Sequence, residues 1–302
     1  MLLKQKAEEA GFLLSGISRA GFMDEEARRL ELWLNNNFHG EMSYMANNFD
    51  KRVDPALLVP GARSVISLAY NYYNPQMQED PEAPILSMYA YGKDYHKVVK
   101  KKLKVLYNWL RTEAGDISGR YFVDSAPVLE RDWAKRSGLG WIGKNTMLIN
   151  PKFGSYFFLA EIITDLEMEY DAPIRDHCGT CTKCIEACPT DAIDENGYHM
   201  DGSKCISYAT IELKSDIPDS FKGRMENRMF GCDICQDVCP WNRFSKPHSE
   251  PEFEPGEQLM KMTREEWNDL TEDRFNLIFN GSAVKRVGFD GLKRNIRMLN
   301  EH

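Results

Sequence analysis

The eight cysteines of this chain all lie in one stretch, from Cys178 to Cys239. The first run in the stretch is Cys-x2-Cys-x2-Cys-x3-Cys-Pro, and it ends at Pro189. The second run is Cys205, a long insertion, and then Cys-x2-Cys-x3-Cys-Pro, which ends at Pro240. Such close spacing brings several thiols together over a few residues, as metal binding requires. The rest of the chain must fold around this stretch.

A terminal Cys-Pro after x2, x2 and x3 spacing is the pattern with which ferredoxin-type proteins hold [4Fe–4S] clusters. In two-cluster ferredoxins, the fourth cysteine of each run binds the other cluster. We therefore predict two clusters that exchange one ligand each. The first cluster is assigned Cys178, Cys181, Cys184 and Cys239, and the second is assigned Cys188, Cys205, Cys232 and Cys235.

Two other uses of paired cysteines explain the pattern less well. Structural zinc takes four ligands in two pairs, which leaves the x3-Cys-Pro ends without a purpose. A disulfide framework is typical of secreted proteins. The first ten residues carry charges where a signal peptide has its apolar segment, so the sequence gives no support for secretion.

The composition is that of an ordinary globular protein. The chain has 302 residues, of which 42% are hydrophobic and 28% charged, and this length suits about two domains. No apolar run approaches the ~18 residues that span a bilayer. Together with reduced thiols, this predicts a cytoplasmic protein with no membrane partner. The formal net charge of −8 argues against indiscriminate coating of nucleic acid, although basic residues can still gather locally.

Hydrophobic periodicity predicts a first part that mixes helices and strands. The expected helices are 2–14, 24–38 and the segment after His96, and the expected strands are 64–70, 121–123 and 156–164. The segment 40–61 is rich in Met, Asn and Pro and is expected to be irregular. Further along, the expected helices are 206–213, 264–280 and 292–300.

Three segments ahead of the cysteines have the composition of ligand-binding loops. The run 89–96 is dense in aromatic and polar groups, and it suits a core edge and the wall of a cofactor pocket equally. Asp124 ends an expected strand, where α/β folds place ligand-facing residues, although a helix-capping aspartate gives the same pattern. Three glycines from Gly138 to Gly143 permit close backbone approach to a large cofactor, but they match no phosphate-binding fingerprint.

Several motifs in combination resemble one known family. They are Val123-Asp124-Ser125-Ala126-Pro127-Val128-Leu129-Glu130-Arg131, Gly140-Trp141-Ile142-Gly143-Lys144-Asn145, the ordered cysteines, and Gly281-Ser282-Ala283-Val284-Lys285-Arg286. Together they resemble the epoxyqueuosine reductases over nearly the whole chain, from about Gly11 onward.

The resemblance implies an α+β fold and an oxidoreductase. We expect a cobalamin-binding, nitroreductase-like α/β catalytic domain at 1–170, a two-cluster ferredoxin-like domain at 171–245, and a C-terminal extension with helices and a basic segment at 246–302. The implied reaction is the reduction of epoxyqueuosine to queuosine at the wobble position of tRNA. Cobalamin would receive electrons from the two clusters, and an external electron donor would reload them.

The resemblance also assigns residues. Asp124 is expected to protonate the substrate oxygen, with Glu130 as the second candidate, and a carboxylic acid with a raised pKa suits this role. Polar residues of the pocket loops are expected to contact cobalamin: Arg52, Tyr91, Asn145, Ser207 and Asp233.

A basic C-terminal segment, 284–297, is expected to contact tRNA phosphates. Its assigned residues are Lys285, Arg286, Lys293 and Arg294. A second basic run lies between Lys97 and Lys104. The chain ends at His302 without the helical repeat domain that often follows in this family, so we expect the grip on tRNA to differ from that of members that have one.

Two other functions explain part of the sequence. A ferredoxin-type electron-transfer module accounts for the cysteines, but not for the aromatic-rich sequence of the first 170 residues. A cobalamin-dependent reductase of a small molecule, of the dehalogenase kind, accounts for the cofactors, but does not need a basic C-terminal segment.

Overall fold

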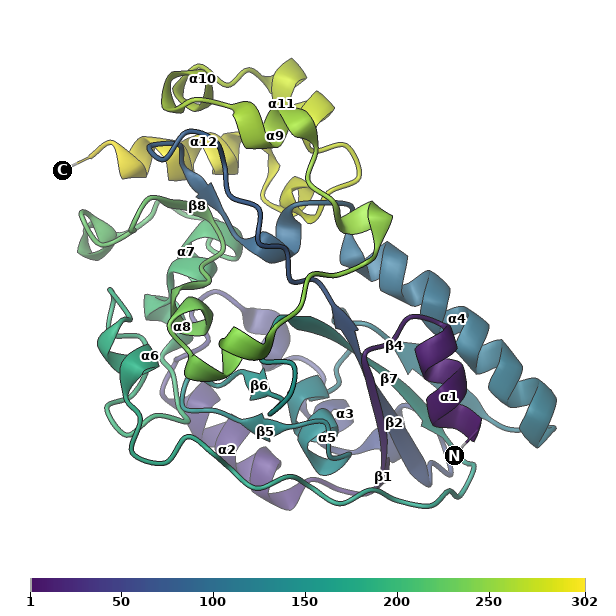
Figure 1. The fold of residues 1–302 in the computed structure, drawn as a ribbon. Helices are drawn as coiled ribbons and strands as arrows, with labels where there is room; N and C mark the ends of the chain where they lie inside the picture. Colours follow the sequence, from purple (N-terminus) through teal and green to yellow (C-terminus); the bar gives the residue numbers. More distant parts are fainter. Residues whose placement is uncertain (1, 302) are drawn as a thin grey trace.

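The computed structural model describes residues 2–301 and mixes helices with strands (Figure 1). The main sheet has the strand order β1-β2-β7-β4, and each neighbouring pair is antiparallel. These strands are β1 (Leu14–Arg19), β2 (Ser64–Asn71), β7 (Phe157–Thr164) and β4 (Gly119–Phe122). Two small sheets pair β3 (Ile85–Leu86) with β8 (Arg228–Phe230) and β5 (Trp141–Ile142) with β6 (Leu148–Ile149).

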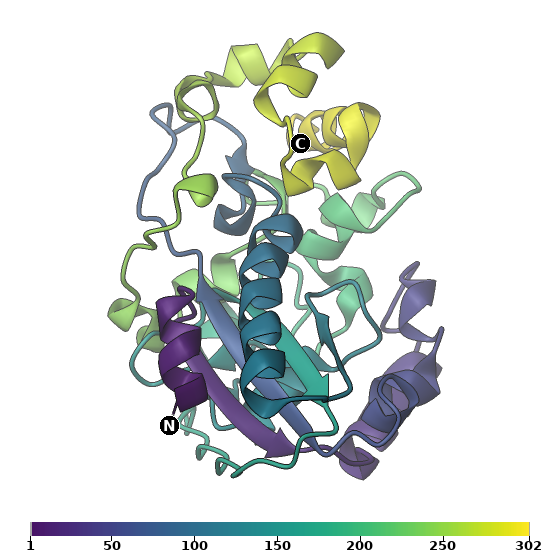
Figure 2. The same cartoon turned by 90° about the vertical axis from the view of Figure 1, so that its right-hand side faces the viewer.

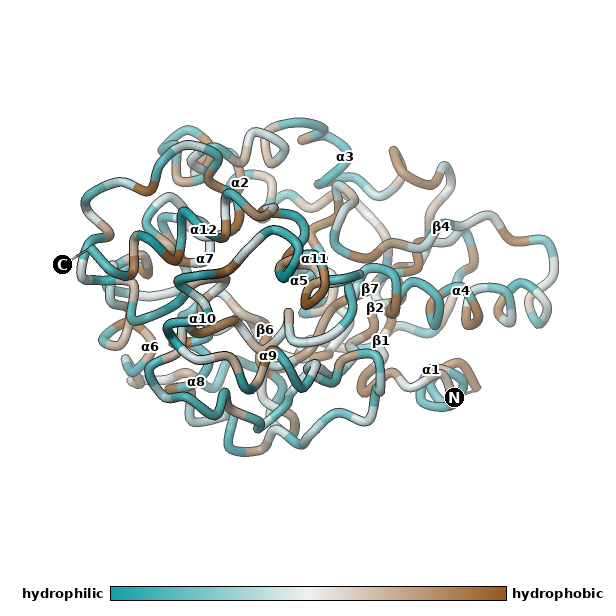
Figure 3. Tube along the Cα trace, turned by 90° about the horizontal axis from the view of Figure 1, so that it is seen from above, coloured by the Kyte–Doolittle hydropathy of each residue, from teal (hydrophilic) through white to brown (hydrophobic). Residues whose placement is uncertain are grey.

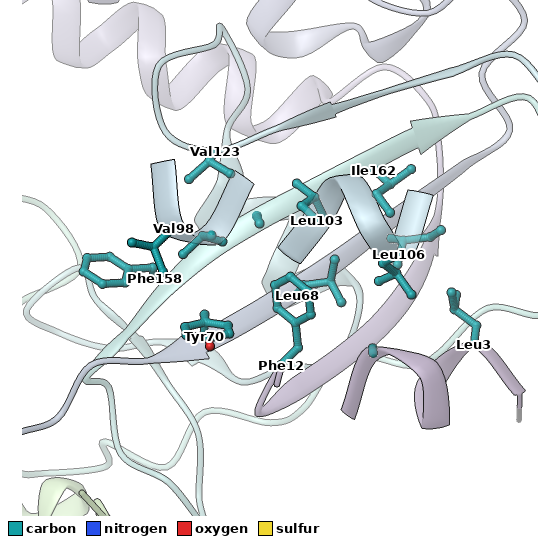
Figure 4. Close-up of a cluster of buried hydrophobic side chains, with 14 of the residues drawn as sticks. Leu3, Phe12, Leu68, Tyr70, Val98, Leu103, Leu106, Val123, Phe158 and Ile162 are labelled. Atoms are coloured by element: carbon teal, nitrogen blue, oxygen red, sulfur yellow. The ribbon is translucent and has the colours of Figure 1, made fainter. Parts of the chain in front are cut away.

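One face of the main sheet is covered by α1 (Leu2–Glu9) and α4 (Tyr95–Ala114), as Figure 2 shows. The periodic apolar residues of α4 form the predicted buried stripe, which includes Leu103 and Leu106. They belong to the same core as Leu68 of β2 and Ile162 of β7 (Figure 4). The central strands β2 and β7 are buried along almost their whole length, since helices cover both faces of the sheet, and most of their side chains are apolar.

The opposite face of the sheet is covered by α5 (Glu130–Arg136), which contacts β1, β2 and β7. Beyond it lie α2 (Asp24–Asn35) and α3 (Phe49–Val53). Gly16 of β1 permits this packing, because a Cβ there would meet the carbonyl oxygen of Ser137 at 1.9 Å. The sheet therefore holds the start of α5 close to the middle of β7.

The cysteine stretch and the C-terminal helices lie at one end of the sheet (Figure 1). The stretch contains α6 (Lys183–Glu186), α7 (Ile206–Ile211) and α8 (Ile234–Asp237), and the chain closes with α9 (Glu257–Lys261), α10 (Arg264–Asn268), α11 (Glu272–Ile278) and α12 (Gly288–Leu299). The two ends of the described chain lie on opposite sides of the molecule (Figure 3). No helix within residues 2–301 is long and apolar enough to cross a bilayer.

Two expected helices were wrong. The first ends at Glu9, because Gly11 turns the chain with a φ of 94° and the next residues join the sheet as β1. The expected helix 264–280 is two helices, α10 and α11. The break is fixed at Thr271, whose side chain accepts the backbone N–H of Arg274 and begins a new helix.

The mixed helix-and-sheet fold is confirmed, and its parts are interlocked. β3, from the expected first domain, pairs with β8 inside the cysteine stretch. The backbone N–H of Asp94 donates to the carbonyl oxygen of Gly281 in the C-terminal part, at 2.7 Å. The boundaries at 170 and 245 and the relation to nitroreductases stay predictions.

Candidate active site

Asp124 lies just past the end of β4, in left-handed backbone with a φ of 55°. Its Oδ2 accepts a hydrogen bond from the Tyr95 hydroxyl at 2.9 Å and lies 2.8 Å from Nε2 of His96. The other ring nitrogen of His96, Nδ1, lies 2.7 Å from Oδ1 of Asp94. A histidine between two carboxylates is held in its charged form. We call Asp124, Tyr95 and His96 the acid group.

Three distant segments position the acid group. The ring of Tyr95 stacks on Phe158 of β7 and on His96, with centroid distances of 4.1 Å in both cases. Asp94 caps α4 by accepting the backbone N–H of His96, and it is itself fixed by Gly281. The first turn of α4, the sheet and the C-terminal segment therefore meet at this site.

The surroundings of Asp124 favour its ionised form. Its side chain is 45% exposed, yet the atoms around it desolvate the carboxyl group, which raises its pKa. The hydrogen bond and charge of His96, helped by Tyr95 and Arg286, outweigh this effect, so the pKa of Asp124 is lowered. Burial lowers the pKa of His96, but its hydrogen bonds to Asp124 and Asp94 have a larger opposite effect, so the pKa of His96 is raised overall. This arrangement therefore favours the proton on His96 over the proton on Asp124.

Two carboxyl groups near Asp124, those of Glu130 and Glu161, have a raised pKa. Oε1 of Glu130 accepts the backbone N–H of Asp124 at 2.5 Å. Burial, followed by the charge of Asp124, raises the pKa of Glu130 to about 8. Glu161 of β7 has no exposed surface, and burial and the adjacent Glu130 raise its pKa well above the usual value. The expectation of a raised pKa at Asp124 is wrong for this arrangement, because the cationic His96 lies against it.

Four thiols lie together near the protein surface, and we call them the outer quartet: Cys178, Cys181, Cys184 and Cys239. Burial, followed by the three adjacent thiols, raises the pKa of Cys184 to about 11. The indole N–H of Trp141 points at Sγ of Cys178, 3.5 Å away. Trp141 packs edge-on against Trp241, which adjoins the exposed ring of Phe244.

The remaining thiols form the inner quartet: Cys188, Cys205, Cys232 and Cys235. All four line a cavity of about 300 Å³. Burial raises the pKa of Cys235 well above its usual value, and so do the nearby Cys205 and Cys232. All eight cysteines are free and partly accessible; those of the inner quartet face the cavity. The two quartets are the two predicted ligand sets, and their ligation of clusters stays a prediction.

Within residues 2–301, no three His, Cys, Asp or Glu side chains converge closely enough to hold one metal ion. A zinc ion draws its thiolates to about 2.3 Å from one point. A four-iron cube is held by thiolates at its corners, so its ligands stand farther apart.

The cavity adjoins the acid group through its aromatic wall. Tyr72 and Tyr89 line it, and Tyr89 packs edge-on against Tyr95 with a centroid distance of 6.0 Å. Tyr89 therefore separates the inner quartet from the Tyr95 hydroxyl that holds Asp124. The run 89–96, which suited a core edge or a pocket wall, does both here.

Three of the five expected cobalamin contacts line the cavity: Asn145, Ser207 and Asp233. The amide of Asn145 donates to the carbonyl oxygen of Cys235 at 3.1 Å. Asp233 is buried, and it accepts the hydroxyl of Ser87 and the backbone N–H of Met88. These contacts orient polar groups on the cavity wall.

The other two expected cobalamin contacts, Arg52 and Tyr91, are not among the residues that line the cavity. Arg52 donates to the carbonyl oxygen of Tyr44 at 2.7 Å, and its buried Nε has no partner among residues 2–301. Tyr91 packs against the core formed by α10, α11 and α12.

The expected tRNA-binding residues make contacts within the fold. Arg294 donates to the carbonyl oxygens of Leu213 and Ser215, at 2.9 and 2.5 Å, and so ties α12 to the insertion. Lys293 donates to a carbonyl oxygen at 2.5 Å, and Lys285 donates to the side chain of Asn276.

Arg286 lies closest to the acid group. It pairs with Glu212 at 2.7 Å and lies 6.0 Å from the ring of Tyr44, and its charge acts on Asp124. Its side chain is 46% exposed. Of the four basic residues, Arg286 is the one that these contacts place at the mouth of the site.

Comparison with known proteins identifies the family. A family model for epoxyqueuosine reductase matches residues 52–125, and a model for a 4Fe-4S double cluster binding domain matches residues 177–242. An epoxyqueuosine reductase of Leadbetterella byssophila is 58% identical over 299 residues, which cover 99% of this chain and 97% of that protein. The chain belongs to the epoxyqueuosine reductase family. It is therefore an oxidoreductase with a domain of the kind that binds two [4Fe–4S] clusters.

Solved epoxyqueuosine reductases have the same fold. One crystal structure, with an epoxyqueuosine-modified tRNA-Tyr stem loop, matches with a TM-score of 0.90 at 33% identity and covers 99% of this chain and 80% of that chain. Another, from Bacillus subtilis, matches with a TM-score of 0.88 at 32% identity and covers 99% and 80%. In that second structure a catalytic loop that carries an aspartate is swung out of the active site.

Sequence reasoning did not bring three residues of the candidate site together with Asp124: Tyr95, His96 and Glu161. His96 and Tyr95 were included in a polar aromatic run, but nothing local in the sequence shows that they contact Asp124. Glu161 had a visible signal, because it is the one acid in the apolar run of β7. An acid inside a doubly buried strand is costly and calls for an explanation.

Proposed function

We propose that the protein reduces epoxyqueuosine to queuosine in tRNA. One observation carries the proposal: the acid group adjoins a cavity that all four thiols of the inner quartet line. Removal of an epoxide oxygen requires electrons and protons at the same place. The relative whose structure contains an epoxyqueuosine-modified stem loop supports this choice of substrate.

The overall reaction fixes what the site must supply. An epoxide becomes an alkene when it takes up two electrons and two protons, and its oxygen leaves as water. Side chains supply protons, but electrons must come from a redox cofactor. The two quartets would hold the clusters that deliver these electrons, one at a time.

We infer that cobalamin binds in the cavity, between the inner quartet and the acid group. When bound, it supplies the cobalt chemistry that breaks the carbon–oxygen bond. The cavity wall fits such a group, with the aromatic rings of Tyr72 and Tyr89 and the polar side chains of Asn145, Ser207 and Asp233. At about 300 Å³, the cavity is at the lower end of the usual range of roughly 300–1,000 Å³ for ligand sites. A cofactor larger than this volume would therefore extend beyond the cavity.

The acid group handles the proton at the substrate oxygen. Asp124 is exposed enough to reach a substrate, and Tyr95 and His96 hold its carboxylate in one orientation. His96 carries the proton in the described conformation, and transfer to Asp124 makes a neutral acid of that carboxyl group. The swung-out loop of the Bacillus subtilis relative supports a mobile role for such an aspartate.

Substrate RNA would approach the exposed side of the acid group. Arg286 lies at this mouth between Glu212 and Tyr44, with its guanidinium half exposed. Guanidinium groups bind phosphate oxygens in a bidentate manner, and aromatic rings such as Tyr44 stack on unpaired bases. Lys285, Lys293 and Arg294 are assigned a supporting role, because their polar ends already bind atoms of the protein.

The test is an anaerobic conversion assay. Protein with both clusters reconstituted is mixed with cobalamin, a chemical reductant and an anticodon stem loop that contains epoxyqueuosine. We expect mass spectrometry to show the loss of one oxygen from the nucleotide, and no loss when cobalamin is omitted. A parallel reaction contains free epoxyqueuosine in place of the stem loop. A reductase of small molecules would convert it, whereas an enzyme that acts on tRNA should not. A fully loaded protein that leaves the stem loop unchanged would contradict the proposal.

A further inference from the structure

Glu161 occupies a position that is built for apolar side chains. It lies in the middle of β7 and faces α5, between Leu159 and Ile163 on the same face of the strand. Directly opposite it are Ser67 of β2 and Phe122 of β4. Its side chain has no exposed surface, and neither of its carboxyl oxygens accepts a hydrogen bond from a donor of residues 2–301. A carboxyl group in this state is strongly destabilised if it is ionised.

The carboxyl group of Glu130 is the neighbour of Glu161. The ion pairs found within residues 2–301 involve neither of the two groups. Glu161 is buried and Glu130 is partly buried, and we call the two residues the carboxyl pair. Two carboxylates cannot hydrogen-bond to each other. A proton on one of them turns the contact into an O–H···O bond and removes the repulsion, as in other carboxyl pairs that share a site.

The pair is linked directly to the acid group. Oε1 of Glu130 accepts the backbone N–H of Asp124, so the same residue touches both Glu161 and the catalytic loop. The other charged groups near the pair are Asp124, His96 and Arg131. Asp124 and His96 face Glu130 from the loop and from α4, and Arg131 lies beside it on α5, with its guanidinium donating to the carbonyl oxygen of Thr146 at 2.6 Å.

We propose that the carboxyl pair stores the proton that recharges Asp124 in each catalytic cycle, with Glu130 as the donor and Glu161 as the residue that keeps the proton there. This inference rests on the proposed function and deepens it. The reaction consumes two protons, whereas the described acid group holds only one, on His96. A second proton-carrying group next to Asp124 supplies the other proton. Solvent then need not reach the site while the bound substrate covers it.

The proton transfer balances without any change in oxidation state. The O–H bond of Glu130 breaks, and an O–H bond forms on the Asp124 carboxylate, directly or through one water molecule. Asp124 then gives this proton to the substrate oxygen, whose reducing electrons come from the clusters. Solvent returns a proton to the pair after the product leaves. Glu161 acts through Glu130 and is therefore a positioning residue.

The decisive variant is Glu161→Gln, because glutamine keeps the shape and the hydrogen bond but stores no proton. An amide donating to Glu130 favours its ionised form. In single-turnover reactions with pre-reduced protein, we therefore expect the alkaline decline of the rate to move to lower pH by roughly one unit or more. KM for the stem loop should stay constant. Glu161→Asp, which keeps an acid, should restore part of the wild-type profile.

Glu26→Gln is the matched control, because Glu26 is also a buried carboxylate but is paired with Arg136 on the far side of α5, at 2.6 Å. It should lower stability and leave the pH profile unchanged. If Glu161→Gln reduces the rate equally at every pH, or leaves the alkaline decline where it is, the pair does not supply the proton.

A spectroscopic measurement separates this inference from the proposed function. The infrared spectrum of the resting wild type at neutral pH should contain a carbonyl band of a protonated carboxylic acid. This band should be absent from the spectrum of Glu161→Gln, so it appears in the difference between the two. Absence of that band in the wild type overturns the inference, whatever the activity. A wild type that shows the band but converts no epoxyqueuosine contradicts the proposed function instead.

Discussion

The two thiol quartets of this protein each consist of four cysteine side chains, but their surroundings differ. The outer quartet lies beside Trp241 and the 37% exposed ring of Phe244, and Gly179 of its loop has open space where a side chain would be. The inner quartet lines the cavity next to the acid group. Clusters bound by the two quartets would be two redox centres in series, one near the surface and one near the acid group, and this order would define a direction of electron flow. Electrons should enter at the outer quartet and leave at the inner one.

The strongest test of this comparison is to disable one quartet at a time. Cys235→Ser removes an inner ligand and should reduce conversion to background with every reductant, because the inner quartet is the one that lines the cavity. Cys181→Ser removes an outer ligand and should abolish turnover driven by a protein donor, but leave slow turnover with a small chemical reductant. Iron analysis of each variant confirms which cluster is lost. Equal residual activity in both variants would contradict the proposed direction of electron flow from the outer to the inner quartet.

The next test keeps both clusters and removes the acid. Asp124→Asn cannot give a proton to the substrate oxygen, so the rate should fall by roughly 10²–10⁴-fold, the usual contribution of general acid catalysis. The absorption spectra of the clusters and of added cobalamin should not change. Wild-type turnover in this variant would place the proton donor elsewhere, with His96 or Glu130 as the remaining candidates.

A smaller effect concerns stability near the acid group. The folded-state pKa of Glu130 is raised from 4.5 to about 8, so the folded protein holds its proton over a range where the unfolded chain releases it. Stability should therefore fall as pH rises from about 4.5 to 8, and the loss should level off above that range. Each pKa unit corresponds to at most about 1.4 kcal/mol.

Glu161→Gln lowers the pKa of Glu130 and should flatten this decline. The midpoint of denaturant unfolding, measured at pH 5 and pH 8, provides the check. A wild-type midpoint that does not decrease between these values would mean that the carboxyl pair is not protonated in the folded protein.

The smallest expected effect is on RNA binding. Arg286→Gln removes one phosphate contact and should reduce the slope of log affinity against log salt by about one unit. Lys104→Gln, on the exposed face of α4, is the matched control and should leave the slope unchanged if the RNA lies on the C-terminal side. The reverse result would place the RNA on α4, the second basic run of the sequence.

The sequence predicted the cysteine quartets better than the acid group for a physical reason. Ligand spacing is largely local, since three cysteines of the outer quartet, and two of the inner quartet, come from one short run each. The acid group and the carboxyl pair come from residues 95–96, 124–130 and 161, which only the sheet and α4 bring together. Asp124 was found through its motif, whereas its partner His96 has no motif signal of its own.

The same reasoning explains the errors in the fold. The apolar strands β2 and β7 and the stripe of α4 follow from hydrophobic periodicity. The edge strand β1 was missed because its alternation is interrupted by Ser15, Gly16 and Ser18, and its conformation depends on pairing with β2. Pairing across the chain is not visible in a local pattern.

The most direct test of the account follows both clusters during one turnover. Protein reduced in advance and loaded with cobalamin is mixed with the epoxyqueuosine stem loop, frozen at intervals, and examined by electron paramagnetic resonance and mass spectrometry. Spectra of Cys181→Ser and Cys235→Ser assign the two cluster signals. We predict that the inner cluster is oxidised first, in step with the formation of queuosine, and that the outer cluster is oxidised afterwards. Oxidation of the outer cluster first, or queuosine formation while the inner cluster stays reduced, would contradict the account.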